Sequence, residues 1–209
     1  MKNTSLLGAF VAGILLAQPA LAQNVKVTPL GGQDGEFCPL DRALIFEDPN
    51  GTRVLYDPGR TVAGADDPRL GKIDVVLVSH MHGDHVGDLH AKAPNSGACD
   101  KPDFSVSAKP NSSAVNIAVA KGAKMVTGSE MAGFFGNKLK AAGGDPKNSI
   151  LARFGATQKV GGVSISTVTA IHSNALDPEL IGGVLGQYLK EAGIGAYVGE
   201  ATGYVLKFS

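Results

Sequence analysis

Three of the five histidines in this chain fall within six consecutive residues, 80–85, directly after a run of apolar residues. That run, Ile73–Ser79, is rich in β-branched side chains and nearly continuous, which predicts a strand buried on both faces. His80 and His82 stand two positions apart, so in extended backbone their side chains point the same way. Gly83 then permits a turn. The chain must therefore fold so that a buried strand ends in a loop crowded with imidazoles, and catalytic loops commonly occupy such strand ends.

The chemistry of this loop points to metal binding. Imidazole and carboxylate groups are the ligands that zinc and similar divalent ions take. We expect His80 and His82 to face one ion, and Asp84 and His85 to face a second. The alternative is a solvated polar loop with incidental histidines, which the spacing of four ligand-type residues within six positions disfavours.

The rest of the chain alternates short strands with helices. Ala43–Glu47 and Arg53–Asp57 flank the turn sequence 48–51, which is typical of a β-hairpin. Further strands are predicted at 25–30, 124–127, 163–170 and 203–208, and helices at 111–121, 129–142 and 177–191. This alternation predicts an α/β fold, or α+β in some classification schemes.

Length and charge narrow the class of protein. At about 150 residues per domain, 209 residues predict one domain. An apolar fraction of 44% is enough for a core and excludes a disordered chain. Lysine and arginine together number 19, as do aspartate and glutamate, so the chain lacks the basic excess of a nucleic-acid binder. We expect a small-molecule partner instead.

The N-terminal segment predicts export. Residues 1–22 read as a secretory signal peptide, with an apolar stretch at Leu6–Ala17 and a small-x-small cleavage pattern at Ala20–Ala22. A membrane anchor is the alternative, but the apolar stretch is too short to span a bilayer. We therefore predict a signal peptide at 1–22, a mature domain at 23–209, a periplasmic or secreted location, and no stable membrane insertion.

The two cysteines agree with that location but leave alternatives open. Cys38 and Cys99 could pair in an oxidising compartment. Two unpaired thiols are a second reading, and Cys99 as a metal ligand is a third. One bridge would join two loops and would not form the framework of the fold.

The segment Ser79–Leu89, SHMHGDHVGDL, resembles the signature of the metallo-β-lactamase superfamily of metallohydrolases. The layout before it is similar as well, because a hairpin with the turn Tyr56–Gly59 precedes the strand that enters the loop. The resemblance implies an αββα sandwich with the metals at one edge, between two sheets. It also implies one or two zinc ions, although histidine and carboxylate ligands do not exclude iron or manganese.

The resemblance implies a role for each ligand. His80 and His82 belong to a first zinc site, and Asp84 and His85 belong to a second. The family supplies a third histidine to the first site from the end of a later strand. Here His172 fits that position, because it follows the predicted strand at 163–170.

Two carboxylates are assigned supporting and catalytic roles. Asp57 resembles a family aspartate that supports the metal loop by hydrogen bonding, although it could be only a turn residue. Asp84 is the candidate catalytic residue, since it would orient the nucleophile and carry a proton to the leaving group. We expect Asp88 and His90 on a helix after the loop, in surface or supporting roles.

The chain departs from the family pattern after His172. The family supplies a bridging aspartate, often in a Gly-Asp-Thr-like turn, and a final histidine near the C-terminus. This sequence has no histidine after His172, and Asp177 and Glu200 do not match the bridging position. We therefore expect a chain truncated at its C-terminus, a sandwich incomplete there, and a second site reduced to Asp84 and His85.

The resemblance implies a hydrolase that uses metal-activated water on an ester, lactone, amide or phosphodiester bond. Thr169–Asn174 and the glycine-rich stretch Gly182–Gly203 are similar to a lactonase-like and uncharacterised branch of the family. Two alternatives stay open. One is a true metallo-β-lactamase that hydrolyses β-lactam antibiotics, and the other is an inactive, truncated metal-binding fragment.

Overall fold

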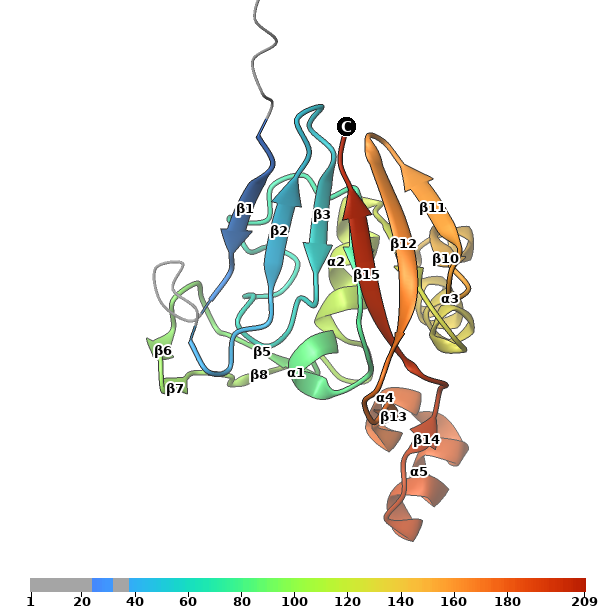
Figure 1. Ribbon diagram of the computed structural model, residues 1–209. Coiled ribbons are helices and arrows are strands. Elements are labelled where there is room, and N and C mark those ends of the chain that lie inside the picture. Colours follow the sequence, from blue (N-terminus) through green and yellow to red (C-terminus); the bar gives the residue numbers. More distant parts are fainter. Residues whose placement is uncertain (1–23, 32–37) are drawn as a thin grey trace, which may run out of the picture.

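The computed structural model describes residues 24–31 and 38–209. Two β-sheets packed face to face form its centre, and helices lie behind the larger sheet (Figure 1). The predicted signal peptide at 1–22 lies outside the described residues. The mixed α/β class expected from the sequence is confirmed.

The larger sheet has six strands in the order β1-β2-β3-β4-β9-β10. Strands β1, β2 and β3 pair antiparallel, and β3, β4, β9 and β10 pair parallel. Their bounds are β1 Lys26–Pro29, β2 Leu44–Glu47, β3 Arg53–Tyr56, β4 Val75–Leu77, β9 Lys124–Thr127 and β10 Ser149–Leu151. Because parallel strands end at the same edge, the segments that follow β3, β4, β9 and β10 all emerge together.

The smaller sheet is antiparallel, in the order β11-β12-β15. Its strands are β11 Thr157–Val160, β12 Val163–Ala170 and β15 Ala201–Lys207. Alternate residues of β12 are buried against the larger sheet, so the strand has the period of two that its sequence predicts. The apolar layer between the sheets contains Val54, Val75, Leu77, Val126, Ala152, Val163 and Ile165.

Two helices cover the other face of the larger sheet: α2 Ser113–Lys121 and α3 Met131–Ala141. Ser112 caps α2 by accepting a hydrogen bond from the N–H of Val115, and Gly122 ends the helix in left-handed backbone. Phe135 of α3 is fully buried in the core beneath. Within the described ranges, no helix is both long and apolar enough to cross a membrane.

The described elements thus stack as helices, sheet and sheet. The outer face of the smaller sheet carries the exposed side chains of Val168 and Val205. No described helix lies over that face in Figure 1. Three of the four layers expected for the sandwich are therefore present in the part of the chain that the structure describes.

The remaining elements are short. They are α1 Gly83–Val86, β5 Leu89–His90, β6 Gly97–Ala98, β7 Lys101–Pro102, β8 Val106–Ser107, the 3-10 helix η1 Pro146–Asn148, β13 Ala175–Leu176, α4 Pro178–Ile181, α5 Gly183–Ala192 and β14 Ala196–Tyr197. The prediction of one helix over 177–191 is wrong. Gly182 and Gly183 both have positive φ, so the chain turns between α4 and α5.

The expected helix after the histidine loop is also absent from the described structure. Helix α1 ends after one turn because Gly87 adopts left-handed backbone. Asp88 is buried and forms a bidentate ion pair with Arg60, at 2.8 and 3.0 Å. His90 lies in β5, where its ring packs against Gly64.

Cys38 and Cys99 form a disulfide, with Cα atoms 5.3 Å apart. The bond joins the segment before β2 to the segment after β6. The disulfide therefore connects two loops, and neither cysteine lies in a strand of the two main sheets.

Candidate metal centre

The histidine loop is held where the two sheets meet. Beyond the end of β4, the carbonyl of Ser79 accepts a hydrogen bond from the N–H of Thr202 in β15, at 2.7 Å. The hydroxyl of Tyr204 lies 2.9 Å from the carbonyls of Val78 and Val126. These contacts fix the backbone from which the histidine side chains project.

Three of the predicted ligands come together. Coordinating atoms of His80, His82 and His172 all lie within 4.8 Å of one another. The His172 ring lies 4.5 Å from that of His80 and 5.2 Å from that of His82, between centroids. His80 is buried, His82 is partly buried and His172 is exposed. The cluster therefore opens to solvent on the side of His172.

The donor set suits one divalent ion. Nε2 of His80 lies 3.1 Å from Nδ1 of His82. Two imidazole nitrogens on one tetrahedral zinc ion lie about 3.3 Å apart, given zinc–nitrogen distances of about 2.0–2.1 Å. Three imidazoles also suit iron, so these donors do not distinguish the two metals.

The surroundings of His80 and His82 favour the neutral imidazole, which is the form that binds a metal. Burial, followed by the nearby rings of His85, His82 and His172, lowers the pKa of His80 to about 3. Burial, followed by His172, also lowers the pKa of His82. Both imidazoles are therefore neutral at pH 7, as metal coordination requires.

Asp57 lies beneath the loop and is fully buried. Its carboxylate accepts hydrogen bonds of 2.7 Å from the N–H of Ser79, the hydroxyl of Ser79 and Nδ1 of His85. Because the Ser79 hydroxyl donates to Asp57, it accepts from Nδ1 of His80 at 2.9 Å. We assign the Nδ1–H tautomer to His80 and His85 on this network, which leaves Nε2 of each ring free to bind a metal.

Asp84 lies at the exposed side of the loop. Its Oδ2 is 3.2 Å from Nε of Arg42 and 3.5 Å from Nε2 of His85. Asp84 and His85 are thus adjacent, but they lie outside the group formed by the three histidines within the described chain. Arg42 was missed by the sequence reasoning, because it comes from the segment before β2 and has no local motif.

Asn174 is a second residue that the sequence reasoning missed. It is buried, and its Oδ1 accepts a hydrogen bond from the N–H of Met81 at 2.9 Å. Its Nδ2 donates to the carbonyl of Gly199 at 3.0 Å. Asn174 therefore ties the segment that carries His172 to the histidine loop. Its position two residues after His172 was the available signal.

An apolar cleft of about 250 Å³ adjoins His82. Its walls are formed by the histidine loop and by the segment around β13. The lining residues are Met81, His82, Gly83, Ala175, Leu176, Asp177, Pro178 and Gly195. A ligand in this cleft would contact His82 directly.

The family model described as the beta-lactamase superfamily domain matches residues 41–197, which contain all five predicted ligands. The chain belongs to the metallo-β-lactamase superfamily. The match extends from the segment that carries Arg42 to β14, so it includes the whole histidine cluster and every strand of the two sheets except β1 and β15. The superfamily membership implied by the histidine motif is therefore confirmed.

Three curated relatives are each named a UPF0173 metal-dependent hydrolase. The relative from Anaeromyxobacter dehalogenans is 31% identical over 145 residues, 66% of this chain and 42% of its own length. The relative from Koribacter versatilis is 29% identical over 164 residues, which cover 77% of this chain and 51% of the relative. The relative from Pyrococcus furiosus is 30% identical over 158 residues, which cover 74% of this chain and 56% of the relative. The chain spans about half the length of these relatives.

One similar solved structure is Igni18, a metallo hydrolase from the archaeon Ignicoccus hospitalis. It is 20% identical to this chain, with a TM-score of 0.49. The similarity covers 88% of this chain and 56% of that one.

Proposed function

We propose that the protein is a metal-dependent hydrolase of small molecules with an ester or lactone bond. The observation that carries this proposal is the convergence of His80, His82 and His172 within 4.8 Å at a solvent-exposed edge. A site with three protein ligands and an open side has the form of a catalytic metal site and differs from a closed structural one. The names of the curated relatives support the same reaction class.

The metal centre would divide its tasks among these residues. His80, His82 and His172 would hold the ion. When bound there, a divalent metal supplies Lewis acidity and an activated water. Asp57 and Ser79 fix the rings of His80 and His85, so the ligands need little rearrangement on binding.

Asp84 is proposed as the residue that moves the proton. Its carboxylate is partly exposed and so reaches a substrate at the open side of the cluster. Arg42 holds this carboxylate in position through the contact of 3.2 Å. Asp84 would orient the attacking water, accept its proton and deliver the proton to the leaving oxygen.

The apolar cleft beside His82 favours esters and lactones among the bonds that such a centre hydrolyses. Its walls are mainly methionine, alanine, leucine and proline side chains, with one carboxylate, Asp177. Such walls suit an uncharged acyl group. A phosphodiester would bring its negative charge out of water against these apolar walls, which disfavours it, and Asp177 is already paired with Lys109 at 3.1 Å.

We also propose that the protein acts in the periplasm or outside the cell. The leader-like sequence at 1–22 is one support. The disulfide between Cys38 and Cys99 is a second, because such bonds persist in oxidising compartments. Expression of the full chain in a bacterial host, followed by fractionation, tests this part. A mature chain that starts at Gln23 in the periplasmic fraction is expected, and an unprocessed cytoplasmic chain would contradict it.

The function is tested by metal content and turnover together. Residues 23–209, exported to the periplasm, should bind about one zinc per chain, as expected for a three-histidine site. His80→Ala should abolish that binding, and His90→Ala is the matched control because His90 lies outside the cluster. Metal is measured by inductively coupled plasma mass spectrometry.

Turnover on a lactone and ester panel, with nitrocefin alongside, then separates the alternatives. Lactone or ester hydrolysis that His80→Ala removes supports the proposal. Preferential nitrocefin turnover would favour a β-lactamase, and metal binding without turnover would favour an inactive metal-binding chain.

A further inference from the structure

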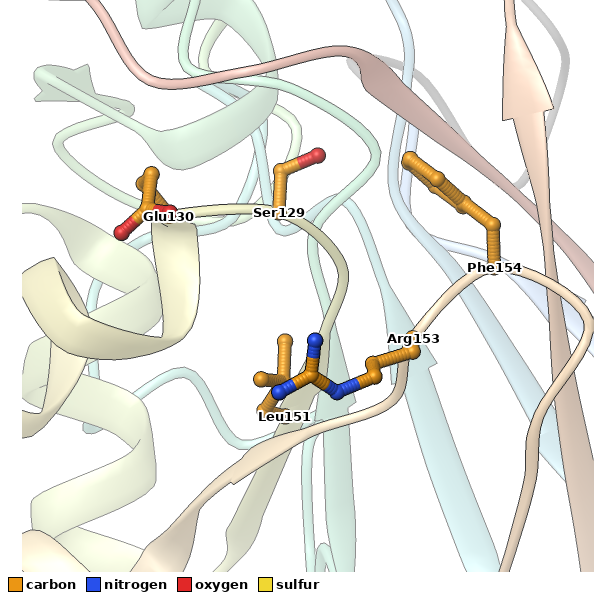
Figure 2. Close-up of a pocket in the computed structure, with 5 residues that line it drawn as sticks. All are labelled: Ser129, Glu130, Leu151, Arg153 and Phe154. Atoms are coloured by element: carbon orange, nitrogen blue, oxygen red, sulfur yellow. The ribbon is translucent and has the colours of Figure 1, made fainter.

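A second hollow, of about 240 Å³, lies on the same edge of the larger sheet as the histidine loop. Figure 2 shows the side chains that line it. Ser129 and Glu130 follow β9, and Leu151, Arg153 and Phe154 lie at the end of β10. Neither the proposed mechanism nor the sequence reasoning uses these residues.

The register of the sheet places this hollow near the metal centre. Leu77 of β4 pairs with Val126 of β9, and Val126 pairs with Ile150 of β10. His80 comes three residues after Leu77 of β4, and Arg153 comes three residues after Ile150 of β10. Since neighbouring strands lie about 4.8 Å apart, the two chains leave the sheet about 10 Å from each other. A small molecule of two linked groups spans that distance.

One short segment borders both sites. The hydroxyl of Ser129 donates to the carbonyl of Glu200 at 3.1 Å, on the side of the hollow. Nδ2 of Asn174, which also holds the histidine loop, lies 3.4 Å from the same carbonyl. Two residues further on, Thr202 bonds to Ser79. The chain at 199–202 therefore contacts both the edge of the hollow and the loop that carries His80.

Arg153 brings a positive charge to the hollow and forms no ion pair within the described structure. Its side chain is exposed, and among the described residues its guanidinium has no hydrogen bond or ion pair. In Figure 2 the side chain of Arg153 extends from the segment after β10 into the space bordered by Leu151, Ser129 and Glu130. Glu130, at the opposite side, forms no ion pair with it. A guanidinium with five free donors suits a planar or tetrahedral anion.

The start of α3 borders the hollow, where the helix dipole favours an anion and the carboxylate of Glu130 opposes it. Helix α3 has 11 residues, and Glu130 at its N-cap makes no capping hydrogen bond through its side chain. Unpaired N–H groups at a helix N-terminus carry partial positive charge. The apolar surfaces of Leu151 and Phe154 complete the hollow, so it offers a cation beside a hydrophobic wall.

We propose that Arg153 selects substrates that carry a carboxylate or phosphate group about 10 Å from the hydrolysed bond. The acyl centre would lie at the histidines, and the anionic end would pair with the guanidinium. Phe154 and Leu151 would contact the carbon chain near that end. This inference rests on the proposed function, because it names the substrate class of the same site.

Anion binding to the metal-free protein tests the inference without any turnover. Glutarate and inorganic phosphate are titrated into residues 23–209 by isothermal calorimetry. Arg153→Gln should weaken binding by about tenfold to a hundredfold, the range for losing a charged hydrogen-bonding partner. Lys159→Gln, an exposed cation of β11 outside the hollow, should leave binding unchanged. Tighter glutarate binding would indicate a carboxylate and tighter phosphate binding a phosphate, and either supports the inference.

Two results would overturn the inference. One is a wild-type chain that binds neither anion in the millimolar range. The other is an Arg153→Gln variant that binds both anions as the wild type does. Because Arg153 is exposed and its side chain forms no hydrogen bond or ion pair among the described residues, the variant should fold, and circular dichroism checks this.

Turnover by the metal-loaded protein then separates this inference from the proposed function. The substrates are the mono-4-nitrophenyl ester of nonanedioic acid, whose extended chain matches the separation of about 10 Å between the two sites, and uncharged 4-nitrophenyl nonanoate. Arg153→Gln should lower the ratio of their kcat/KM values by about tenfold, and Lys159→Gln should not. Turnover whose ratio is unchanged in Arg153→Gln contradicts the inference alone. Absent turnover with Arg153-dependent anion binding contradicts only the hydrolase proposal.

Discussion

The carboxylate of Asp57 accepts a hydrogen bond from Nδ1 of His85 at 2.7 Å, across 28 positions of sequence. The same carboxylate holds Ser79 through its N–H and its hydroxyl. One buried side chain at the end of β3 thus orients the residues on both sides of the histidine loop. The stability of the fold and the geometry of the metal centre are coupled at this point.

Asp57→Asn should therefore weaken both properties. The variant keeps the size of the side chain but loses the charge and at least one acceptor, so we expect about 2–4 kcal/mol less free energy of unfolding. Metal affinity should fall by about tenfold to a hundredfold, as for other residues that hold metal ligands. Urea unfolding and zinc titration measure the two effects. Asp103→Asn, at an exposed position, is the control. Unchanged zinc affinity in Asp57→Asn would contradict the assigned role.

His172→Ala should separate metal binding from stability. His172 is exposed, so the metal-free variant should unfold within about 0.5 kcal/mol of the wild type. Its zinc content should nevertheless fall, because a three-ligand site becomes a two-ligand site. Ile171→Ala, which replaces a fully exposed neighbour, is the matched control and should keep its zinc. Equal zinc content in both variants would remove His172 from the ligand set.

The ion pair between buried Asp67 and partly exposed Arg69 should make stability depend on pH. Burial opposes ionisation of Asp67, but Arg69 and the N–H groups of Ala63 and Arg69 outweigh it, so its pKa lies below the ordinary value. A lowered pKa in the folded state stabilises the protein above about pH 3.9, the unfolded value, and this contribution is lost as the pH falls below it.

Asp67→Asn should cost about 1–3 kcal/mol at neutral pH, because Arg69 and two backbone N–H groups lose their charged acceptor. The difference from the wild type should shrink as the pH falls below about 4. Urea midpoints measured from neutral to acid pH test this, with exposed Asp66→Asn as the control. A difference independent of pH would show that the carboxylate does not titrate with the predicted sign.

The disulfide should stabilise the fold through the loop that it closes. Cys38 and Cys99 are separated by 61 positions, for which the chain-entropy account gives about 4 kcal/mol, with measured bonds typically about 2–4 kcal/mol. Dithiothreitol should lower the urea midpoint of the wild type by a corresponding amount. The double variant Cys38→Ser, Cys99→Ser should unfold at the reduced midpoint with or without the reductant. An equal midpoint for oxidised and reduced wild type would contradict this expectation.

Segments with strong local patterns were predicted well. Strand β12 has the bounds expected from its alternation, and the hairpin of β2 and β3 agrees with the prediction to within one residue at each end. The histidine loop was identified because its ligands are adjacent in sequence. His172 was chosen because the resemblance implies a third histidine at the end of a later strand, and only His172 follows one. For the strands and the histidine loop, the deciding information lies within a few residues.

Features that depend on tertiary contact were missed. Arg42 faces Asp84 only because the loop before β2 folds over the metal centre. Asn174 meets Met81 across 93 positions, and its place two residues after His172 does not reveal that contact. Strand β10 has three residues, too few for a periodic signal, so its parallel pairing with β9 and the hollow at its end were invisible in the sequence.

The hydrogen bond from the N–H of Thr202 to the carbonyl of Ser79 affects how the protein unfolds locally. Since β15 of the smaller sheet donates directly to the backbone before His80, the histidine loop cannot detach while the sheets stay together. The loop and the sheet interface therefore form one cooperative unit, unlike loops that fray alone. The amide protons of Thr202 and Ser79 should exchange with solvent only as fast as the whole domain unfolds.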